Sequence, residues 1–279
     1  MPVSDLMAML AADDEIVVVD CRFELAKPAV GALMYTEGHI PGALYADLNR
    51  DLAGPATSTS GRHPLPDIAE FARKLGDWGI TRGIPVIAYD QRDGAYAARL
   101  WWLLRWLGHV DVAVLDGGFE QWLAAGGEVS NSVSAPFRRK FEPCPGPFSP
   151  ISTEELVKAL SAEFPPLLLD ARGAERFRGE VEPIDSRGGH IPGAKNWPFT
   201  QNVDADGLWK GRDAIRALWE RNTGSVQYKQ WIAMCGSGVT ACHLALAAEI
   251  AGISPPRLYI GSWSEWIRDS ARPIAKGDN

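Results

Sequence analysis

The chain repeats itself, and this internal repeat limits the possible folds more than any other feature. Residues 38–43, Gly-His-Ile-Pro-Gly-Ala, recur letter for letter as residues 189–194. Three further matches keep the same order along the chain: residues 17–22 with 167–172, 86–107 with 231–251, and 115–122 with 259–266. Four matches at a nearly constant offset are hard to obtain by chance, so we predict two homologous halves.

Each half alternates short β-rich runs with helical stretches. Because parallel strands need crossover connections, this alternation predicts an α/β fold in which each half has a mostly parallel β-sheet flanked by helices. The predicted strands are residues 16–20, 43–47, 85–89, 112–116, 167–170, 194–197, 231–234 and 257–260. The clearest predicted helices are residues 67–75, 95–107 and 241–251, together with one that begins at a capping-box pattern in residues 152–155.

A proline-rich stretch separates the two halves. Residues 128–150 contain Pro136, Pro143, Pro145, Pro147 and Pro150 and show little periodicity, which is typical of an extended linker. We therefore predict a first domain at residues 1–127, a linker at residues 128–150 and a second domain at residues 151–279.

The main chemical signal lies between the strand and the helix predicted at residues 231–234 and 241–251. The loop that joins them begins with Cys235, so its thiol is expected at a helix N-terminus, where unpaired amides and the helix dipole favour a negative charge. A thiol in that setting ionises readily and becomes a nucleophile. We predict that Cys235 is a catalytic thiolate, although a cysteine after a strand is also often a small buried hydrophobe. The loop residues expected to cradle it are Gly236, Ser237, Gly238, Val239 and Thr240.

The first half has no cysteine at the corresponding position. Asp90 stands there, and an aspartate cannot act as a sulfur nucleophile. The repeat therefore predicts one catalytic half, the second, and one non-catalytic half.

Composition and charge exclude several classes of protein. A net charge of −7 argues against a nucleic-acid partner, and residues 100–107, the longest apolar stretch, are too few to span a membrane. No basic segment precedes the apolar residues at the N-terminus, so no signal peptide is expected. The cysteines show no metal-ligand spacing and suit a reducing cytoplasm. They are Cys21, Cys144, Cys235 and Cys242.

These motifs together resemble one known family. The two Gly-His-Ile-Pro-Gly-Ala segments, the Asp-x-Arg strand ends, the Cys235 loop and the Gly-Ser-Trp-Ser-Glu-Trp stretch at residues 261–266 are similar to the tandem rhodanese-domain sulfurtransferases. This is the family of thiosulfate and 3-mercaptopyruvate sulfurtransferases, and the likeness covers nearly the whole chain. It implies that Cys235 takes a sulfur from a small anionic donor, becomes a persulfide, and passes the sulfur to cyanide or to a thiol such as thioredoxin or a low-molecular-weight thiol. No cofactor or metal is implied, because the protein itself carries the sulfur.

Within that family the loop distinguishes the donors. A Cys-Gly-Ser-Gly-Val-Thr loop goes with 3-mercaptopyruvate, whereas thiosulfate enzymes have cationic residues after the cysteine. Gly236 and Ser237 are neutral here, so 3-mercaptopyruvate is the predicted donor and thiosulfate the alternative. Ser237 would relay protons as the pyruvate enolate leaves; the alternative is a hydroxyl that only caps the following helix.

The resemblance also implies residues that bind the donor. Arg176 lies where the family has a substrate arginine, and an arginine fork suits a donor carboxylate. The second family arginine follows Glu-Pro, but Ile184 stands there. Arg187 would replace it, and Arg178 is the less favoured candidate. His63 matches a family histidine that faces the substrate, and a structural role is the alternative.

The resemblance further implies a catalytic acid that comes from the first half, shortly after residues 38–43. The aligned position is Asn49, and the flanking Asp47 and Asp51 are the candidates; the alternative is that neither carboxylate serves.

Two other functions compete with a sulfurtransferase. A non-catalytic rhodanese-like sulfur carrier or binding module would have lost the cysteine in both halves, as at Asp90, and the retained Cys235 argues against it. A related phosphatase would need an arginine after the loop to bind phosphate, where this chain has Ala241.

Overall fold

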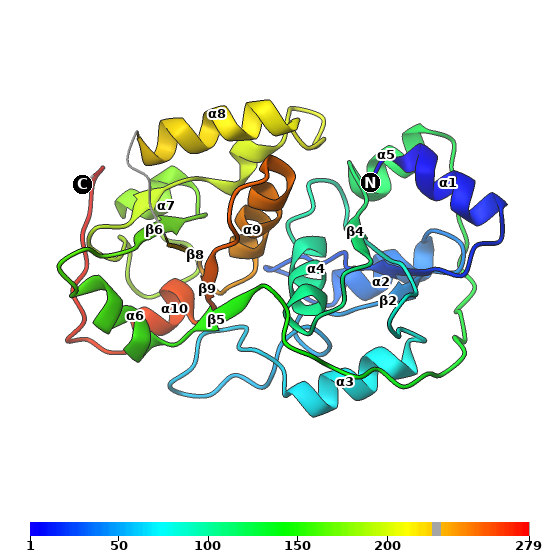
Figure 1. Cartoon of the computed structure of the whole chain (residues 1–279), viewed down its shortest axis with the longest axis horizontal. Coiled ribbons are helices and arrows are strands. Elements are labelled where there is room, and N and C mark those ends of the chain that lie inside the picture. The colour runs from blue at the N-terminus through cyan, green and yellow to red at the C-terminus, as the bar shows by residue number, and fades with distance from the viewer. Residues whose placement is uncertain (225–229, 279) are drawn as a thin grey trace. The chain divides into compact units, whose positions relative to one another are not determined.

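The computed structural model describes residues 1–224 and 230–278, and it divides the chain into two compact units (Figure 1). The first unit comprises Met1–Gly54, Leu65–Pro147 and Ala205–Trp209. The second comprises Pro55–Pro64, Phe148–Asp204 and the described residues from Lys210 onward. Each unit thus includes a short segment from the other half of the chain. The predicted assignment of catalysis to residues 151–279 stays a prediction.

The first unit has a four-stranded sheet in the order β2-β1-β3-β4, and every neighbouring pair of strands is parallel. Helix α4 packs against β3 and β4. The strands are β1 (Val17–Asp20), β2 (Leu44–Tyr45), β3 (Val86–Tyr89) and β4 (Val112–Val114). The helices are α1 (Val3–Ala11), α2 (Val30–Glu37), α3 (Ile68–Asp77), α4 (Ala97–Trp106) and α5 (Gly118–Ala124).

Side chains from α1 and α5 form the core on one face of this sheet. Leu6 and Phe119 lie in one buried cluster with Ile87 and Tyr89 of β3. Because successive strand residues point to opposite faces, the equally buried Val86 and Ala88 face the other side. Both faces are therefore covered, as expected for a parallel sheet.

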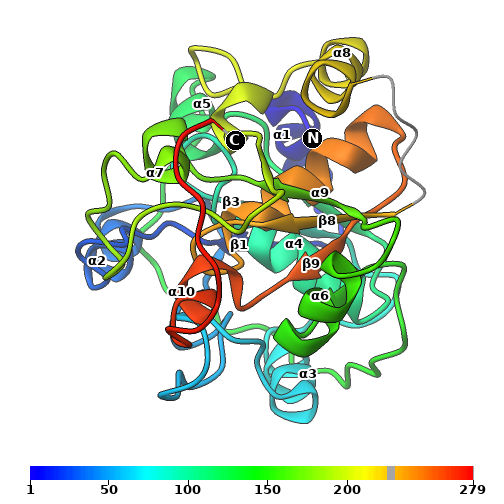
Figure 2. The same cartoon turned by 90° about the vertical axis from the view of Figure 1, so that its left-hand side faces the viewer.

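The second unit has a five-stranded parallel sheet in the order β5-β9-β8-β6-β7. Helices α6 and α10 lie on one side of β8 and β9, and α9 lies on the other (Figure 2). The strands are β5 (Ser149–Ile151), β6 (Leu167–Asp170), β7 (Lys195–Asn196), β8 (Trp231–Met234) and β9 (Arg257–Tyr259). The helices are α6 (Thr153–Leu160), α7 (Ala174–Arg178), the 3₁₀ helix η1 (Phe199–Asn202), α8 (Arg212–Thr223), α9 (Thr240–Ala251) and α10 (Ser262–Trp266).

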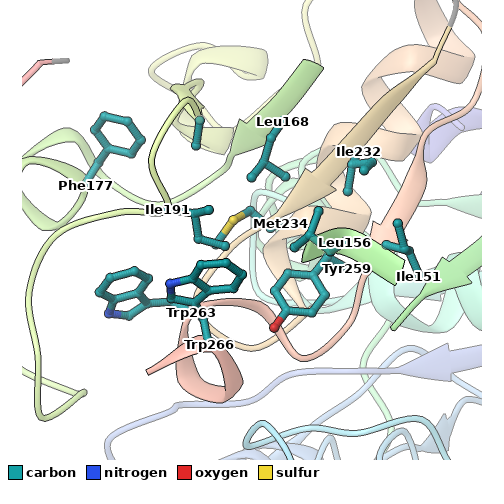
Figure 3. Close-up of a cluster of buried hydrophobic side chains, with 11 residues drawn as sticks. Ile151, Leu156, Leu168, Phe177, Ile191, Ile232, Met234, Tyr259, Trp263 and Trp266 are labelled. Atoms are coloured by element: carbon teal, nitrogen blue, oxygen red, sulfur yellow. The ribbon is translucent and has the colours of Figure 1, made fainter. Parts of the chain in front are cut away.

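The core of the second unit joins α6, α7 and α10 to the sheet. Figure 3 shows this buried cluster, in which Trp263 and Trp266 of α10 lie with Met234 at the end of β8. Large aromatic side chains bury much apolar area, so α10 is held by packing despite its five residues.

The predicted α/β fold class is confirmed, with strands at all eight predicted positions. Strand β5 was not predicted, because Pro150 interrupts its pattern. The strand lies at a sheet edge, where proline is tolerated because its missing N–H group can face away from the ladder. The predicted helix ends are also present: the Asp67 side chain caps α3, Ser152 forms a capping box, and Gly252 ends α9 with a φ of 65°.

The Asp-x-Arg repeat forms the same buried ion pair in both units. Asp20 and Arg22 lie 2.6 Å apart, as do Asp170 and Arg172, and all four residues are at most 3% exposed. Each guanidinium also donates to a carbonyl of the Gly-His-Ile-Pro-Gly-Ala turn, at Gly38 in the first unit and at residue 189 in the second. The repeated motifs therefore hold each turn against the end of a strand.

No helix among the described residues combines the length and the apolar character that crossing a membrane requires.

Candidate active site

Cys235 lies at the carboxyl end of β8, a central strand of its sheet. The loop after it leads directly into α9, which begins at Thr240. In open α/β sheets, ligands bind outside the carboxyl ends of the strands. The strand and the helix therefore place the thiol where a substrate site is expected in this fold.

The start of α10 holds the backbone of this loop in place. The Cys235 amide donates to Ser262 Oγ at 3.1 Å, and the Trp263 amide donates to the Cys235 carbonyl at 3.0 Å. The Ser264 amide donates to the Gly236 carbonyl at 2.9 Å. Ser262 has a φ of 52°, a left-handed conformation that is rare outside glycine, and its hydroxyl also donates to the Tyr259 carbonyl. Residues 259–266 are thus a fixed support for the loop.

Gly238 allows the loop to fold tightly onto that support. Its φ is 75°, and a Cβ added there would lie 2.5 Å from the Ile260 carbonyl oxygen. Only glycine accommodates both the conformation and this close approach.

Several loop amides have no acceptor within the described part of the chain. The N–H groups of Gly236, Ser237, Val239 and Thr240 donate to no atom of residues 1–224 or 230–278. Amides at the start of a helix are left without intrahelical partners, and they favour an anion. The loop predicted to cradle the sulfur therefore has backbone N–H groups that are available to bind an anion. Cys235 itself is only 2% exposed. A sulfur-donating substrate therefore reaches the thiol only if it is small or if the neighbouring residues move.

The loop of the first unit shows what such a turn binds. Asp90 follows β3 as Cys235 follows β8, and its carboxylate is buried. Four loop amides donate to its two oxygens, at distances between 2.8 and 3.1 Å; they belong to Arg92, Gly94, Tyr96 and Ala97. The first unit thus closes its loop around its own anion. Asp90 takes up the donors there, whereas the corresponding amides around Cys235 lack such a partner.

Asp90 leads to a prediction about pH. Burial, with a further contribution from Asp93, raises the pKa of Asp90 to about 6 from 3.8, despite the amide hydrogen bonds. Between these two values the folded state binds more protons than the unfolded state, so this group lowers stability as pH rises. We expect the free energy of unfolding to fall by up to about 3 kcal/mol across this window from Asp90 alone. Urea unfolding of the wild type and of Asp90→Asn between pH 4 and 7 measures the contribution. An unchanged slope in the variant would contradict it.

The structure brings His63 and Ser237 together. His63 Nδ1 lies 2.8 Å from Ser237 Oγ, and both side chains are buried. His63 belongs to the segment Pro55–Pro64, which is held by α10: the Gly61 amide donates to Glu265 and the Arg62 amide to Ser264 Oγ, each at 3.1 Å. The support that holds the Cys235 loop therefore also positions a histidine from the other half of the chain.

Arg176 lies beside the loop. A Cβ added at Gly236 would lie 3.6 Å from Arg176 Nη1. The guanidinium pairs with Glu182 at 2.8 Å and with Asp185 at 3.1 Å. These contacts place a cation next to the residue that follows Cys235.

The two candidates for the missing second arginine differ in their surroundings. Arg187 has a buried Nη1 with no acceptor among the described residues, and its carbonyl accepts from Trp263 Nε1. Arg178 pairs with the exposed Glu180 at 2.7 Å. Ile184, at the family arginine position, is 43% exposed. Arg187 therefore keeps an unused donor, whereas Arg178 belongs to a surface ion pair.

Two further arginines near the loop were not predicted. Arg62 Nη2 would lie 3.0 Å from a Cβ at Gly236, and Arg62 pairs with Asp185. Burial opposes the charge of Arg172, but Asp170, Glu182 and Cys235 raise the pKa of its guanidinium above the ordinary value. The sequence signal for Arg62 was its place next to His63, and for Arg172 the repeated Asp-x-Arg motif.

Asp47 and Asp51 lie in the first unit and make local contacts there. The Asp47 carboxylate accepts from the amides of Asn49 and Arg50 at 2.9 Å. Burial disfavours the charge of Asp51, but hydrogen bonds from Arg50, Lys74 and the Asp47 amide lower the pKa of its carboxyl overall. A catalytic role for either residue stays a prediction.

The described residues include no group of three or more His, Cys, Asp and Glu side chains that could hold a metal ion.

Comparison with known proteins identifies the family. The rhodanese-like domain model matches residues 3–125 and again residues 152–269. A protein of Pseudomonas aeruginosa named "Probable 3-mercaptopyruvate sulfurtransferase" is 46% identical over 275 residues, covering 98% of this chain and 96% of the relative. The thiosulfate sulfurtransferase of Bos taurus is 37% identical over 241 residues, covering 84% of this chain and 78% of its own length. The crystal structure of SseA from Escherichia coli, described as a 3-mercaptopyruvate sulfotransferase, superposes with a TM-score of 0.81 at 30% identity, covering 95% of this chain and 98% of that one.

The chain belongs to the rhodanese family, as a protein with two rhodanese-like domains.

Proposed function

We propose that this protein is a sulfurtransferase that takes sulfur from 3-mercaptopyruvate, carries it on Cys235 as a persulfide, and passes it to cyanide or a thiol. The observation that carries the proposal is the position of Cys235 at a helix N-terminus, in a loop whose amides lack acceptors among the described residues. The names of the relatives support the reaction class. Thioredoxin or a low-molecular-weight thiol would serve as the acceptor, and the spacing of the four cysteines fits a reducing, cytoplasmic location.

The chemistry balances without a cofactor. The Cys235 thiolate attacks the donor sulfur, a sulfur–sulfur bond forms, and the donor carbon–sulfur bond breaks with its electron pair leaving as pyruvate enolate. The proton of the donor thiol ends on the enolate carbon, which gives pyruvate and a deprotonated persulfide. Cyanide then attacks the outer sulfur, so that thiocyanate leaves and the thiolate returns. The loop amides of Gly236 and Ser237 would stabilise the anionic sulfur in both steps.

Ser237 and His63 supply a route for the proton. The 2.8 Å contact between His63 Nδ1 and Ser237 Oγ lets the hydroxyl exchange protons with the imidazole. The enolate leaving group of 3-mercaptopyruvate needs a proton, whereas sulfite, which leaves from thiosulfate, does not. The pair therefore favours 3-mercaptopyruvate as the donor.

Thiosulfate is the second candidate donor, because the bovine relative bears that name. The loop itself contains no cation that would neutralise a dianion. Arg62 and Arg176 approach it from elsewhere in the chain, but both are paired with Asp185. The net charge beside the loop therefore suits a monoanion better.

Replacing Ser237 by alanine tests the donor assignment. We expect Ser237→Ala to lower kcat/KM for 3-mercaptopyruvate about 100-fold, because general acid–base groups contribute factors of this size. The value for thiosulfate is expected to change less than about 5-fold, because sulfite leaves without a proton. Pyruvate and thiocyanate release measure the two reactions. Equal losses with both donors would remove Ser237 from proton transfer, and a wild-type preference for thiosulfate would favour the second candidate.

A non-catalytic sulfur carrier or binding module is the remaining alternative. It predicts no turnover of either donor by the wild-type protein, and at most a single transfer of sulfur to Cys235. The same turnover assay separates this alternative from an enzyme.

A further inference from the structure

We infer that Arg62 is a donor-binding residue that acts with Arg176 as a two-guanidinium clamp for the donor's carboxylate. The inference rests on the proposed function and adds a residue from the first half of the chain to its binding site. It also accounts for the neutral Ile184, because Arg62 supplies the second positive charge.

The two guanidiniums approach the same point of the loop. A Cβ at Gly236 would lie 3.0 Å from Arg62 Nη2, 3.6 Å from Arg176 Nη1 and 3.8 Å from Arg176 Nη2. Gly236 has no side chain, so both groups come close to the backbone next to Cys235. A donor whose sulfur lies at Cys235 would place its carboxylate a few bonds away, within the range of these cations.

Asp185 fixes the relative position of the two arginines. One of its oxygens pairs with Arg62 Nη1 and the other with Arg176 Nη2, and its side chain is only 6% exposed. Glu182 holds Arg176 from a further direction at 2.8 Å. A guanidinium held in this way loses little conformational freedom when it binds an anion, which favours affinity.

The pair still has an unused hydrogen-bond donor. Arg62 Nε is buried and has no hydrogen-bond acceptor among the described residues. A buried N–H group without a hydrogen-bond partner costs free energy. Such a group in a substrate site therefore points to a ligand that supplies the acceptor. A carboxylate has the oxygens to accept this bond.

The backbone of Arg62 is also built into the site. Its amide donates to Ser264 Oγ at 3.1 Å, and the preceding Gly61 approaches so closely that a Cβ there would lie 2.5 Å from the Gly261 carbonyl oxygen. His63 follows and reaches Ser237. Residues 61–63 thus contribute one side chain to the proton route and one to the donor clamp.

The charges of the clamp set a preference among donors. The two arginines share Asp185, and Glu182 adds a second carboxylate. The two positive and two negative charges cancel. The clamp therefore offers N–H groups in fixed positions rather than a large positive electrostatic potential. It therefore suits a monoanionic 2-oxo acid carboxylate better than dianionic thiosulfate.

The test compares Arg62→Ala with Arg257→Ala, a matched control at the start of β9 whose guanidinium pairs with Glu155. We expect Arg62→Ala to lower kcat/KM for 3-mercaptopyruvate about 10- to 100-fold, the range expected for a lost hydrogen bond to a charged group. The kcat/KM for 2-mercaptoethanol as acceptor should not change, because a neutral thiol does not use the clamp. Arg62→Lys should recover part of the loss, and the Arg257 control should match the wild type.

Two outcomes would overturn the inference. One is an unchanged donor kcat/KM in a folded Arg62→Ala protein; the other is an equal loss in the donor and acceptor values, which indicates a structural role. If Arg62→Ala does not fold, Asp185→Asn tests the clamp instead. This substitution removes a carboxylate, so it adds one net positive charge to the clamp. It should shift the kcat/KM ratio several-fold toward thiosulfate, and an unchanged ratio would refute the clamp. Failure of the proposed function looks different: the wild type itself would then turn over neither donor.

Discussion

Replacing Cys235 by serine is expected to reduce sulfur transfer at least about 1,000-fold with either donor. A serine hydroxyl does not ionise near neutral pH and cannot carry sulfur as a persulfide, so the covalent step is lost rather than slowed. The fold should be unaffected, because the oxygen takes the place of a sulfur of similar shape in a loop held by Ser262 and Trp263. Thiocyanate formation from each donor, with the melting temperature recorded for each protein, measures both expectations.

Cys144→Ser is the control for that experiment. Cys144 is partly exposed and lies next to Arg82 in the first unit, so its replacement should leave turnover at the wild-type value. A Cys235→Ser protein that keeps more than about a tenth of wild-type turnover would show that another group performs the chemistry.

The second large effect is on stability. We expect Asp20→Ala to lower the free energy of unfolding by about 3–5 kcal/mol, because it leaves the guanidinium of Arg22 buried without its counter-ion. Arg22 is 3% exposed, and Asp20 also accepts a hydrogen bond from Tyr89, which would lose its partner. Urea unfolding followed by tryptophan fluorescence measures the change.

Asp77→Ala provides the matched comparison for Asp20→Ala. Asp77 pairs with Arg73 at 2.9 Å on α3, where both side chains are exposed, so its loss should cost less than about 1 kcal/mol. Similar values for the two variants would mean that burial does not make the repeated ion pair important.

The repeat allowed the fold to be predicted because it marks the same strands twice. An apolar run followed by Asp-x-Arg predicts a buried strand with an ion pair at its end, and β1 and β6 have this structure. Long apolar helices such as α9 were equally clear. Helices of five residues, such as α7 and α10, were not predicted, because their own sequence is too short to show a period and tertiary packing stabilises them.

Site residues could be predicted from the sequence only where they lie in one short segment or at matching positions of the two halves. Cys235 and Ser237 lie in one loop, and Asp90 marks the corresponding loop of the other half. Arg62 and Asp185 were missed because their ion pair joins residues that are 123 positions apart, and no local pattern reports such a contact. The 2% exposure of Cys235 also follows from tertiary packing rather than from the loop sequence.

The proposed reaction requires that Cys235 itself carries the transferred sulfur. To test this, the protein is mixed with one equivalent of 3-mercaptopyruvate in the absence of an acceptor and then digested, and the masses of its peptides are measured by mass spectrometry. The peptide containing Cys235 is expected to gain the mass of one sulfur atom, and a thiol acceptor added beforehand is expected to prevent this gain. If pyruvate forms while that peptide keeps its original mass and the sulfur appears on Cys21, Cys144 or Cys242 instead, Cys235 is not the residue that carries the sulfur.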